Sequence, residues 1–220
     1  MLHTTELTLY LDDQPLLTLP PLTVAPGEVL TLMGPSGCGK SSLLAALAGV
    51  LPPGGPIRLA GEIRLGERLL TPLAPQARRI GMLFQDDLLF AHLTVAENLM
   101  FGMPAHLRGM AARRACALEA LAEVGLEGQA DKLPGQLSGG QKARVSLLRA
   151  LLAEPEALLL DEPFSRLDKP LRAAFRTLVF ERLKTLGIPA LLVSHDEEDA
   201  PGAILTLTTP CLTKEDSDLV

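Results

Sequence analysis

A glycine-rich segment near the start of the chain carries residue types that bind phosphate. It reads Gly34, Pro35, Ser36, Gly37, Cys38, Gly39, Lys40, Ser41 and Ser42, between an apolar run at 29–33 and a helix-like run at 43–48. Glycines at Gly34, Gly37 and Gly39 allow backbone bends in which successive N–H groups point inward at an anion. Lys40 adds a positive charge for the β- and γ-phosphates, and the Ser41 hydroxyl is placed to bind Mg²⁺. The segment has the P-loop pattern in its required setting, which favours nucleotide binding over a plain glycine-rich turn.

Carboxylate, amide and imidazole side chains follow three other apolar runs. They are Asp161 and Glu162 after the run at 157–160, Gln85 after the run at 80–84, and His195 after the run at 189–194. Ligands gather at the carboxyl ends of parallel strands, so these side chains are expected near the glycine-rich segment. In a P-loop protein the first carboxylate holds Mg²⁺ and the second polarises an attacking water, which assigns these roles to Asp161 and Glu162. The structural alternatives are a capped strand end for the carboxylates and a structural role for His195.

A second glycine-rich segment lies at Leu137–Gln141, just before a helix-like run at 142–153. Its Ser138, Gly139 and Gly140 predict a helix N-terminus that can bind phosphate without a lysine in the turn. The chain therefore carries two predicted anion sites but only one P-loop.

The remaining patterns predict the elements that position these segments. Alternating apolar and polar residues at 4–25, and again at 57–70, predict antiparallel strands. The run at 80–84 predicts a buried core strand, and 88–126 predicts a helical insertion in which Thr94 and Glu97 form a capping box. The apolar positions expected to mark the buried face of its second half are Ala115, Leu118, Leu121 and Val124.

The expected fold class is α/β: a P-loop NTPase core with a mostly parallel sheet flanked by helices, an antiparallel β-subdomain and an inserted helical subdomain. The 220 residues suit one such domain. Its expected parts are a β-subdomain at about 1–28 and 57–78, a core at 29–56, 79–87 and 156–220, and a helical subdomain at about 88–155.

Composition argues against several classes of function. A net charge of −6 without a long basic run disfavours nucleic acid as a partner. Cys38, Cys116 and Cys211 are too far apart for metal-ligand spacing or a disulfide framework, which favours a reduced, cytosolic compartment. No apolar stretch predicts a membrane span or a secretory leader. Tyr10 is the only aromatic residue before Phe84, so it is the one candidate there to stack on adenine, with an exposed strand tyrosine as the alternative.

These motifs, in this order, resemble the ATP-binding subunits of ABC transporters over nearly the whole chain, to about residue 200. The matching motifs are Walker A at 34–41, the Q-loop glutamine Gln85, the signature at 137–141, the Walker B Asp161 with the catalytic glutamate Glu162, and the switch histidine His195. The stretches at 85–90 and 93–98 are similar to bacterial importer ATPases of the polyamine, sulfate, iron and thiamine type.

The resemblance implies a mechanism that uses ATP and Mg²⁺. In a head-to-tail homodimer, the P-loop of one subunit and Ser138, Gly139, Gly140 and Gln141 of the other would clamp one ATP. Glu162 would support hydrolysis while Gln85 and His195 sense the γ-phosphate, with Gln85 joining Ser41 and Asp161 at the metal. Opening and closing of the pair would then drive a membrane partner.

The resemblance also implies partners and a location. Integral membrane permease subunits would hold the protein at the cytoplasmic face of the inner membrane, and a solute-binding protein would act indirectly. We expect the groove after Gln85 to receive a permease helix, with Leu88, Leu89 and Phe90 as contact area or, alternatively, as plain subdomain core.

Three features depart from the family pattern. Arg166 stands where the family usually has Ala, which places a charge at the expected dimer seam. The sequence ends about 25 residues after His195, without the C-terminal regulatory domain of many such importers, and 201–220 departs from the usual strand pattern.

Three other functions are alternatives to transport. A soluble ABC ATPase of DNA repair or translation would carry a long coiled coil or a second cassette. A P-loop kinase would not need Ser138, Gly139 and Gly140. A binding module without turnover is disfavoured by the intact Glu162 and His195.

Overall fold

A parallel sheet forms the centre of the fold in the computed structural model, which describes residues 1–207. Within those residues the sheet has five strands in the order β12-β5-β11-β10-β9. They are β5 (Val29–Met33), β9 (Ile80–Leu83), β10 (Ala157–Asp161), β11 (Ala190–Val193) and β12 (Ile204–Thr206), and every neighbouring pair is parallel. Every residue of β10 and β11 is buried, as expected for strands covered by helices on both faces.

The two edge strands of this sheet, β9 and β12, differ in part from what the sequence predicts. The run at 80–83 is a strand, but β9 lies at the edge of the sheet and Gly81 and Met82 are only partly buried, so the prediction of a buried strand was wrong. Its apolar composition could not distinguish an edge from a central position. At the other edge, β12 pairs with β5 and is the outermost strand of the core sheet within residues 1–207. Residues 208–220, including Cys211, lie outside the described residues.

The predicted antiparallel strands are present and form two small sheets, ordered β4-β1-β7-β8 and β3-β2-β6. Their bounds are β1 (Leu2–Thr4), β2 (Leu7–Leu11), β3 (Gln14–Leu19), β4 (Leu22–Val24), β6 (Ile57–Ala60), β7 (Ile63–Leu65) and β8 (Arg68–Leu69). Their period-two patterns bury alternate side chains such as Leu7 and Leu9, both fully buried.

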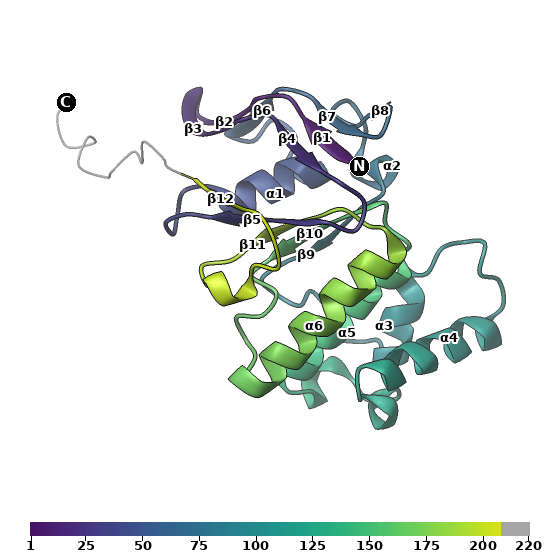
Figure 1. The fold of residues 1–220 in the computed structure, drawn as a ribbon. Coiled ribbons are helices and arrows are strands. Elements are labelled where there is room, and N and C mark those ends of the chain that lie inside the picture. The colour runs from purple at the N-terminus through teal and green to yellow at the C-terminus, as the bar shows by residue number, and fades with distance from the viewer. Residues whose placement is uncertain (208–220) are drawn as a thin grey trace.

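The helices form layers on either side of the core sheet. The α-helices are α1 (Lys40–Ala48), α2 (Pro75–Arg78), α3 (Val95–Gly102), α4 (Met110–Glu123), α5 (Gly139–Leu152) and α6 (Lys169–Leu186). Short 3-10 helices lie at Glu127–Gln129, Pro134–Gln136 and Glu197–Asp199. Figure 1 shows α1 between the core sheet and the antiparallel strands, with α3 to α6 on the opposite side. None of the helices within residues 1–207 has the length and apolar character to cross a membrane.

The helical insertion differs from its predicted form. Residues 88–94 are not helical, and the insertion contains two helices, α3 and α4. The capping box of Thr94 and Glu97 at the start of α3 is confirmed. The buried face of α4 carries Ala117, Ala120 and Leu121, whereas Ala115 and Leu118 are exposed. The predicted positions follow one another at steps of three residues, so they turn steadily away from one face of a helix. Residues spaced by three and four, as observed, stay on the same face.

One buried arginine fixes the end of α1. The guanidinium of Arg78 donates to the carbonyl oxygens of Ala46 at 2.9 Å and Leu47 at 2.7 Å. It also donates to the carbonyls of Leu73 and Thr71, at 2.9 and 3.0 Å. Carbonyls at a helix C-terminus lack partners in a following turn of the helix, so Arg78 adds a donor to the Ala46 carbonyl, which also accepts from the Gly49 N–H, and provides one for the Leu47 carbonyl.

Candidate active site

The P-loop connects β5 to α1 and leaves the first turn of the helix open for a ligand. Gly37 and Gly39 have φ values of 81° and 91°, in the left-handed region that favours glycine. Gly39 is the N-cap of α1, and no side chain caps that end. The free N–H groups and the helix dipole therefore favour an anion at this position.

Gly34 is needed for a different reason from the predicted one. It is not among the glycines with positive φ. A Cβ atom at this position would lie 3.0 Å from the carbonyl oxygen of Leu207 and 3.3 Å from Sγ of Cys38. Gly34 therefore allows a close approach of the chain after β12, a contact that the sequence pattern of the loop alone cannot reveal.

The side chain of Lys40 folds back into the P-loop. Its ammonium donates to the carbonyl oxygens of Gly34 and Pro35, both at 2.8 Å, and lies 3.8 Å from Sγ of Cys38. The side chain of Cys38 is buried, so it contributes packing to the inner side of the loop. These hydrogen bonds thus hold the charge of Lys40 inside the P-loop.

A cavity of about 460 Å³ lies over the P-loop, a size suited to a small-molecule ligand. Many of the predicted site residues line it: Ser36, Gly37, Gly39, Lys40, Ser41, Ser42, Gln85, Asp161 and Glu162. The carboxyl ends of β5, β9 and β10 therefore meet around one space, as expected for parallel strands.

The same cavity has an apolar wall that the sequence analysis missed. Leu11, Leu16 and Ile57 line it from β2, β3 and β6. Tyr10, the predicted adenine-stacking residue, does not line this cavity, and the Arg58 guanidinium lies 5.1 Å from the centre of its ring. Successive strand residues point to opposite faces, so a cavity on the Leu11 side leaves Tyr10 on the other side. The alternation of Leu7, Leu9 and Leu11 was the signal that could have found this wall.

Asp161 ends β10 in a buried position beside the P-loop. Burial raises the pKa of its carboxyl group and nearby Glu162 raises it further, while a hydrogen bond with Ser41 and the charge of Lys40 lower it. A buried carboxylate next to a serine hydroxyl is a chemically suitable pair of oxygen ligands for a hard cation such as Mg²⁺.

Glu162 has an unusual backbone conformation. Its φ of 47° is in the left-handed region, which is uncommon for a residue with a side chain and is often found at functional sites. Its N–H donates to the carbonyl of Val193 at 3.0 Å, and its own carbonyl accepts from the Ser165 hydroxyl at 2.9 Å. These bonds hold the strained turn at the end of β10.

The loop that carries His195 is fixed to α6. Nδ1 of His195 lies 3.4 Å from Oε1 of Glu162. Buried Asp199 accepts from the Ser194 hydroxyl at 2.8 Å and from Nε of Arg172 at 2.9 Å. These hydrogen bonds fix the loop at residues before and after His195. The His195 side chain itself is mostly exposed.

The predicted helix N-terminus at Ser138 is present and lies apart from the P-loop cavity. Ser138 is the N-cap of α5 and makes a capping box with Gln141, whose side chain accepts from the Ser138 N–H at 2.9 Å. Ser138 and Gly139 are exposed, and a Cβ at Gly139 would meet no atom within 4 Å. None of the residues at 138–141 lines the P-loop cavity. One chain thus presents the two helix N-termini predicted to bind phosphate at separate places.

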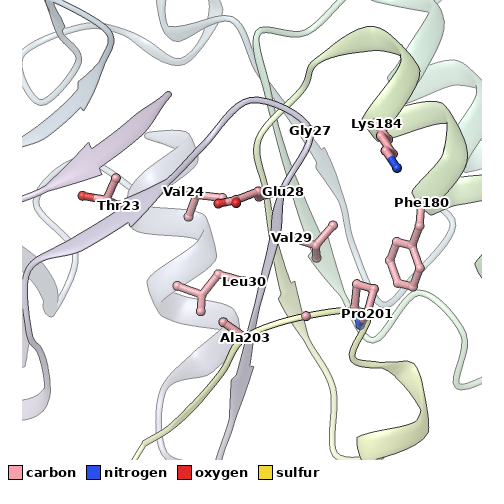
Figure 2. A pocket seen from close by; sticks show the side chains of 11 residues that line it. Thr23, Val24, Gly27, Glu28, Val29, Leu30, Phe180, Lys184, Pro201 and Ala203 are labelled. Atoms are coloured by element: carbon pink, nitrogen blue, oxygen red, sulfur yellow. The ribbon is translucent and has the colours of Figure 1, made fainter.

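Another cavity, of about 370 Å³, contains none of the predicted site residues. Figure 2 shows Val29 and Leu30 at the start of β5 on one side and Phe180 and Lys184 of α6 on the other. It therefore lies at the opposite end of β5 from the P-loop, away from the edge where ligands of parallel sheets bind.

The chain is similar to known proteins of one family. The profile of the family described as ABC transporter matches residues 19–165. An uncharacterized ABC transporter ATP-binding protein of Escherichia coli (strain K12), YnjD, is 49% identical over 201 residues, 91% of each chain. The Fe(3+) ions import ATP-binding protein FbpC 1 of Rhizobium meliloti (strain 1021) is 42% identical over 81% of this chain. The chain spans about half the length of that relative, 49%.

The fold has close relatives among solved structures. The dimeric structure of MJ0796, a bacterial ABC transporter cassette, matches with a TM-score of 0.80 and 30% identity over 94% of each chain. A dimeric post-hydrolysis state of that cassette with ADP and Pi matches equally well, at 29% identity. By sequence, fold and the residues around its P-loop, the chain belongs to the ABC transporter family as an ATP-binding and ATP-hydrolysing subunit.

Proposed function

We propose that the chain powers import of a solute across the bacterial inner membrane as a head-to-tail dimer that closes on ATP and opens after hydrolysis. The observation that carries this proposal is the separation of the P-loop cavity from Ser138 and Gly139 within one chain. Two chains related by a twofold axis can each complete the other's site. The import role of the iron-transport relative supports the direction of transport.

The P-loop residues would hold the phosphates. Backbone N–H groups around Gly37 and Gly39 surround the anion, and Lys40 would exchange its loop carbonyls for β- and γ-phosphate oxygens. The adenine base would lie toward the apolar wall of Leu11, Leu16 and Ile57, rather than against Tyr10.

Mg²⁺ fits the donor set at the end of β10. Ser41, Asp161 and, from the facing loop, Gln85 would hold it, with phosphate oxygens as the remaining ligands. Among the described residues no cluster of three or more His, Cys, Asp or Glu forms a metal site, so binding would depend on the nucleotide. When bound, the cation neutralises charge on the phosphates.

Glu162 is proposed as the general base. It would accept a proton from water as the water oxygen bonds to the γ-phosphorus and the bond to the β,γ-bridging oxygen breaks, with ADP keeping the electron pair. His195, 3.4 Å away, would orient this carboxylate and sense the γ-phosphate together with Gln85.

The parts of the chain would then have separate tasks. The antiparallel strands hold the nucleotide, the core hydrolyses it, and the helical region at about 88–155 carries the motion to a permease at the cytoplasmic membrane face. Leu88 and Phe101 are exposed, and the Phe90 and Phe101 rings lie 4.6 Å apart, so these three form the proposed permease-docking surface. Leu89 packs against the helical core instead. A solute-binding protein would act through the permease.

Mixing two inactive variants tests the dimer. In Lys40→Ala the P-loop loses its charge, and in Ser138→Arg the opposing helix end is blocked. A pair containing one of each keeps one site with both halves intact, so the mixture should regain ATPase activity that neither variant has alone. Mixtures that stay inactive at every ratio and concentration would contradict the head-to-tail dimer.

A further inference from the structure

Arg166 links the turn after Glu162 to the loop after Gln85. Its Nη2 lies 2.5 Å from Oδ1 of Asp86, and its Nη1 lies 3.6 Å from Oδ2 of Asp87. One guanidinium thus contacts two consecutive carboxylates, and its planar fork restricts the loop more than a single point charge would. The positive charge at the expected dimer seam is therefore held by carboxylates of the same chain.

The turn that carries Arg166 is rigid. The Ser165 hydroxyl donates to the Glu162 carbonyl at 2.9 Å, and the Leu167 N–H donates to the Phe164 carbonyl at 3.2 Å. Phe164 is fully buried. A change in the position of Arg166 would therefore displace the strained backbone of Glu162, which lies only a few residues earlier in the chain.

The loop on the other side of the ion pair has only a few further anchors. Arg149 of α5 donates to the carbonyl of Leu88 at 2.9 Å, and the Ser146 hydroxyl donates to the carbonyl of Asp87. Gln85, directly before this anchored stretch, is exposed. Gln85, Asp87, Glu162 and Arg166 all line one gap of only about 10 Å³, so they lie close together around it.

We propose that Arg166 is a positioning residue that holds Gln85 and Glu162 of one chain at a fixed separation, and so sets the rate of hydrolysis rather than the affinity for ATP. This inference rests on the catalytic roles proposed above for Gln85 and Glu162. An exposed ion pair contributes little to stability, so its main effect here is to restrict the loop. Without Arg166, repulsion between the adjacent carboxylates of Asp86 and Asp87 would favour other loop conformations.

The test compares kcat and KM for ATP in the purified chain and in three variants, with Arg114→Ala as the matched control. Arg114 pairs with Asp131 at 2.7 Å, and the side-chain exposures of that pair, 44% and 79%, match the 43% and 77% of Arg166 and Asp86. Arg166→Ala should lower kcat about ten-fold with KM within about two-fold, because small misplacements of reacting groups cost rate. Arg166→Lys keeps the charge but not the fork and should fall between wild type and Arg166→Ala.

Coupling to the loop is measured with Asp86→Asn. The double variant of Arg166→Ala and Asp86→Asn should be no slower than Arg166→Ala alone, since both changes remove one interaction. If the double variant loses as much kcat as the product of the two single losses, the positioning role is overturned. A kcat for Arg166→Ala equal to that of Arg114→Ala would also overturn it. So would a defect confined to ATP-dependent dimer formation, which would place the action of Arg166 across the subunit interface.

Glu162→Gln, measured in parallel, separates this inference from the proposed function. Wild-type turnover in Glu162→Gln would overturn both the catalytic role of Glu162 and the role of Arg166 in positioning it. An inactive Glu162→Gln together with a fully active Arg166→Ala would overturn the positioning role alone.

Discussion

Nδ1 of His195 lies 3.4 Å from Oε1 of Glu162, although the two residues follow different strands of the core sheet. The N–H of Glu162 donates to the carbonyl of Val193, the last residue of the strand before His195, and Asp199 holds the His195 loop through Ser194. These bonds bring the imidazole and the carboxylate together. An imidazole at this distance can orient the carboxylate toward a water molecule.

We expect Glu162→Gln to lower kcat by about 10²-fold or more, because an amide cannot accept the proton of the attacking water. The phosphate contacts remain, so the variant should accumulate as an ATP-bound dimer. Size-exclusion chromatography with ATP and Mg²⁺ measures this, with Lys40→Ala as the comparison that should stay monomeric. A variant that remains monomeric at high concentration would count against closure on ATP.

Asp161→Asn should stabilise the nucleotide-free chain and abolish its response to Mg²⁺. Burial raises the pKa of Asp161 above its ordinary value of 3.8, so the native state binds more protons than the unfolded state. The stability that this group contributes is present below pH 3.8 and is lost as the pH rises through the native pKa. The difference in Tm between variant and wild type should therefore grow as the pH rises through the native pKa of Asp161 and then level off. Thermal melts in buffers of increasing pH, with and without Mg²⁺-ATP, measure both effects.

Arg78→Ala should lower the free energy of unfolding by about 3 kcal/mol, because it removes four hydrogen bonds to carbonyl oxygens of α1 and of the 71–73 loop, of which the two to α1 are buried. Arg78→Lys should lose nearly as much, since one ammonium cannot reach all four carbonyls. Urea denaturation gives the values. Arg64→Ala, which removes an exposed pair with Glu62 at 3.2 Å, serves as the control and should cost less than about 1 kcal/mol. Equal losses at the two positions would refute the anchoring role of Arg78.

The docking surface of Leu88, Phe90 and Phe101 can be tested through membrane recruitment. Leu88→Ser and Phe101→Ser should each weaken co-purification with the permease at least about ten-fold, as expected for apolar residues at the centre of an interface. Leu186→Ser changes an equally exposed leucine, 51% against 55% for Leu88, on the far helix α6. Recruitment that falls equally in all three variants would show a general loss of folding rather than a specific surface.

The sequence predicted the parts of the site that depend on local chemistry. Residue type and spacing identified the P-loop, the carboxylates at the end of β10, the capping box at Thr94 and the helix N-terminus at Ser138, because each is formed by neighbours in the chain. The alternating strands were predicted for the same reason. Contacts between distant segments could not be read this way. The approach of Leu207 to Gly34, the apolar cavity wall and the two partners of Arg166 depend on how strands and loops are placed in space.

The helix α5 touches both halves of the proposed mechanism. Its first turn presents Ser138 and Gly139, and its middle holds the loop after Gln85 through Ser146 and Arg149. Its 14 residues form a rod about 21 Å long, which moves as one piece. In the proposed dimer, a displacement of the loop at one nucleotide would therefore shift the helix end that closes on the other nucleotide. Such a linkage would make the two hydrolysis events cooperative, and the rate should then rise with ATP concentration with a Hill coefficient above one.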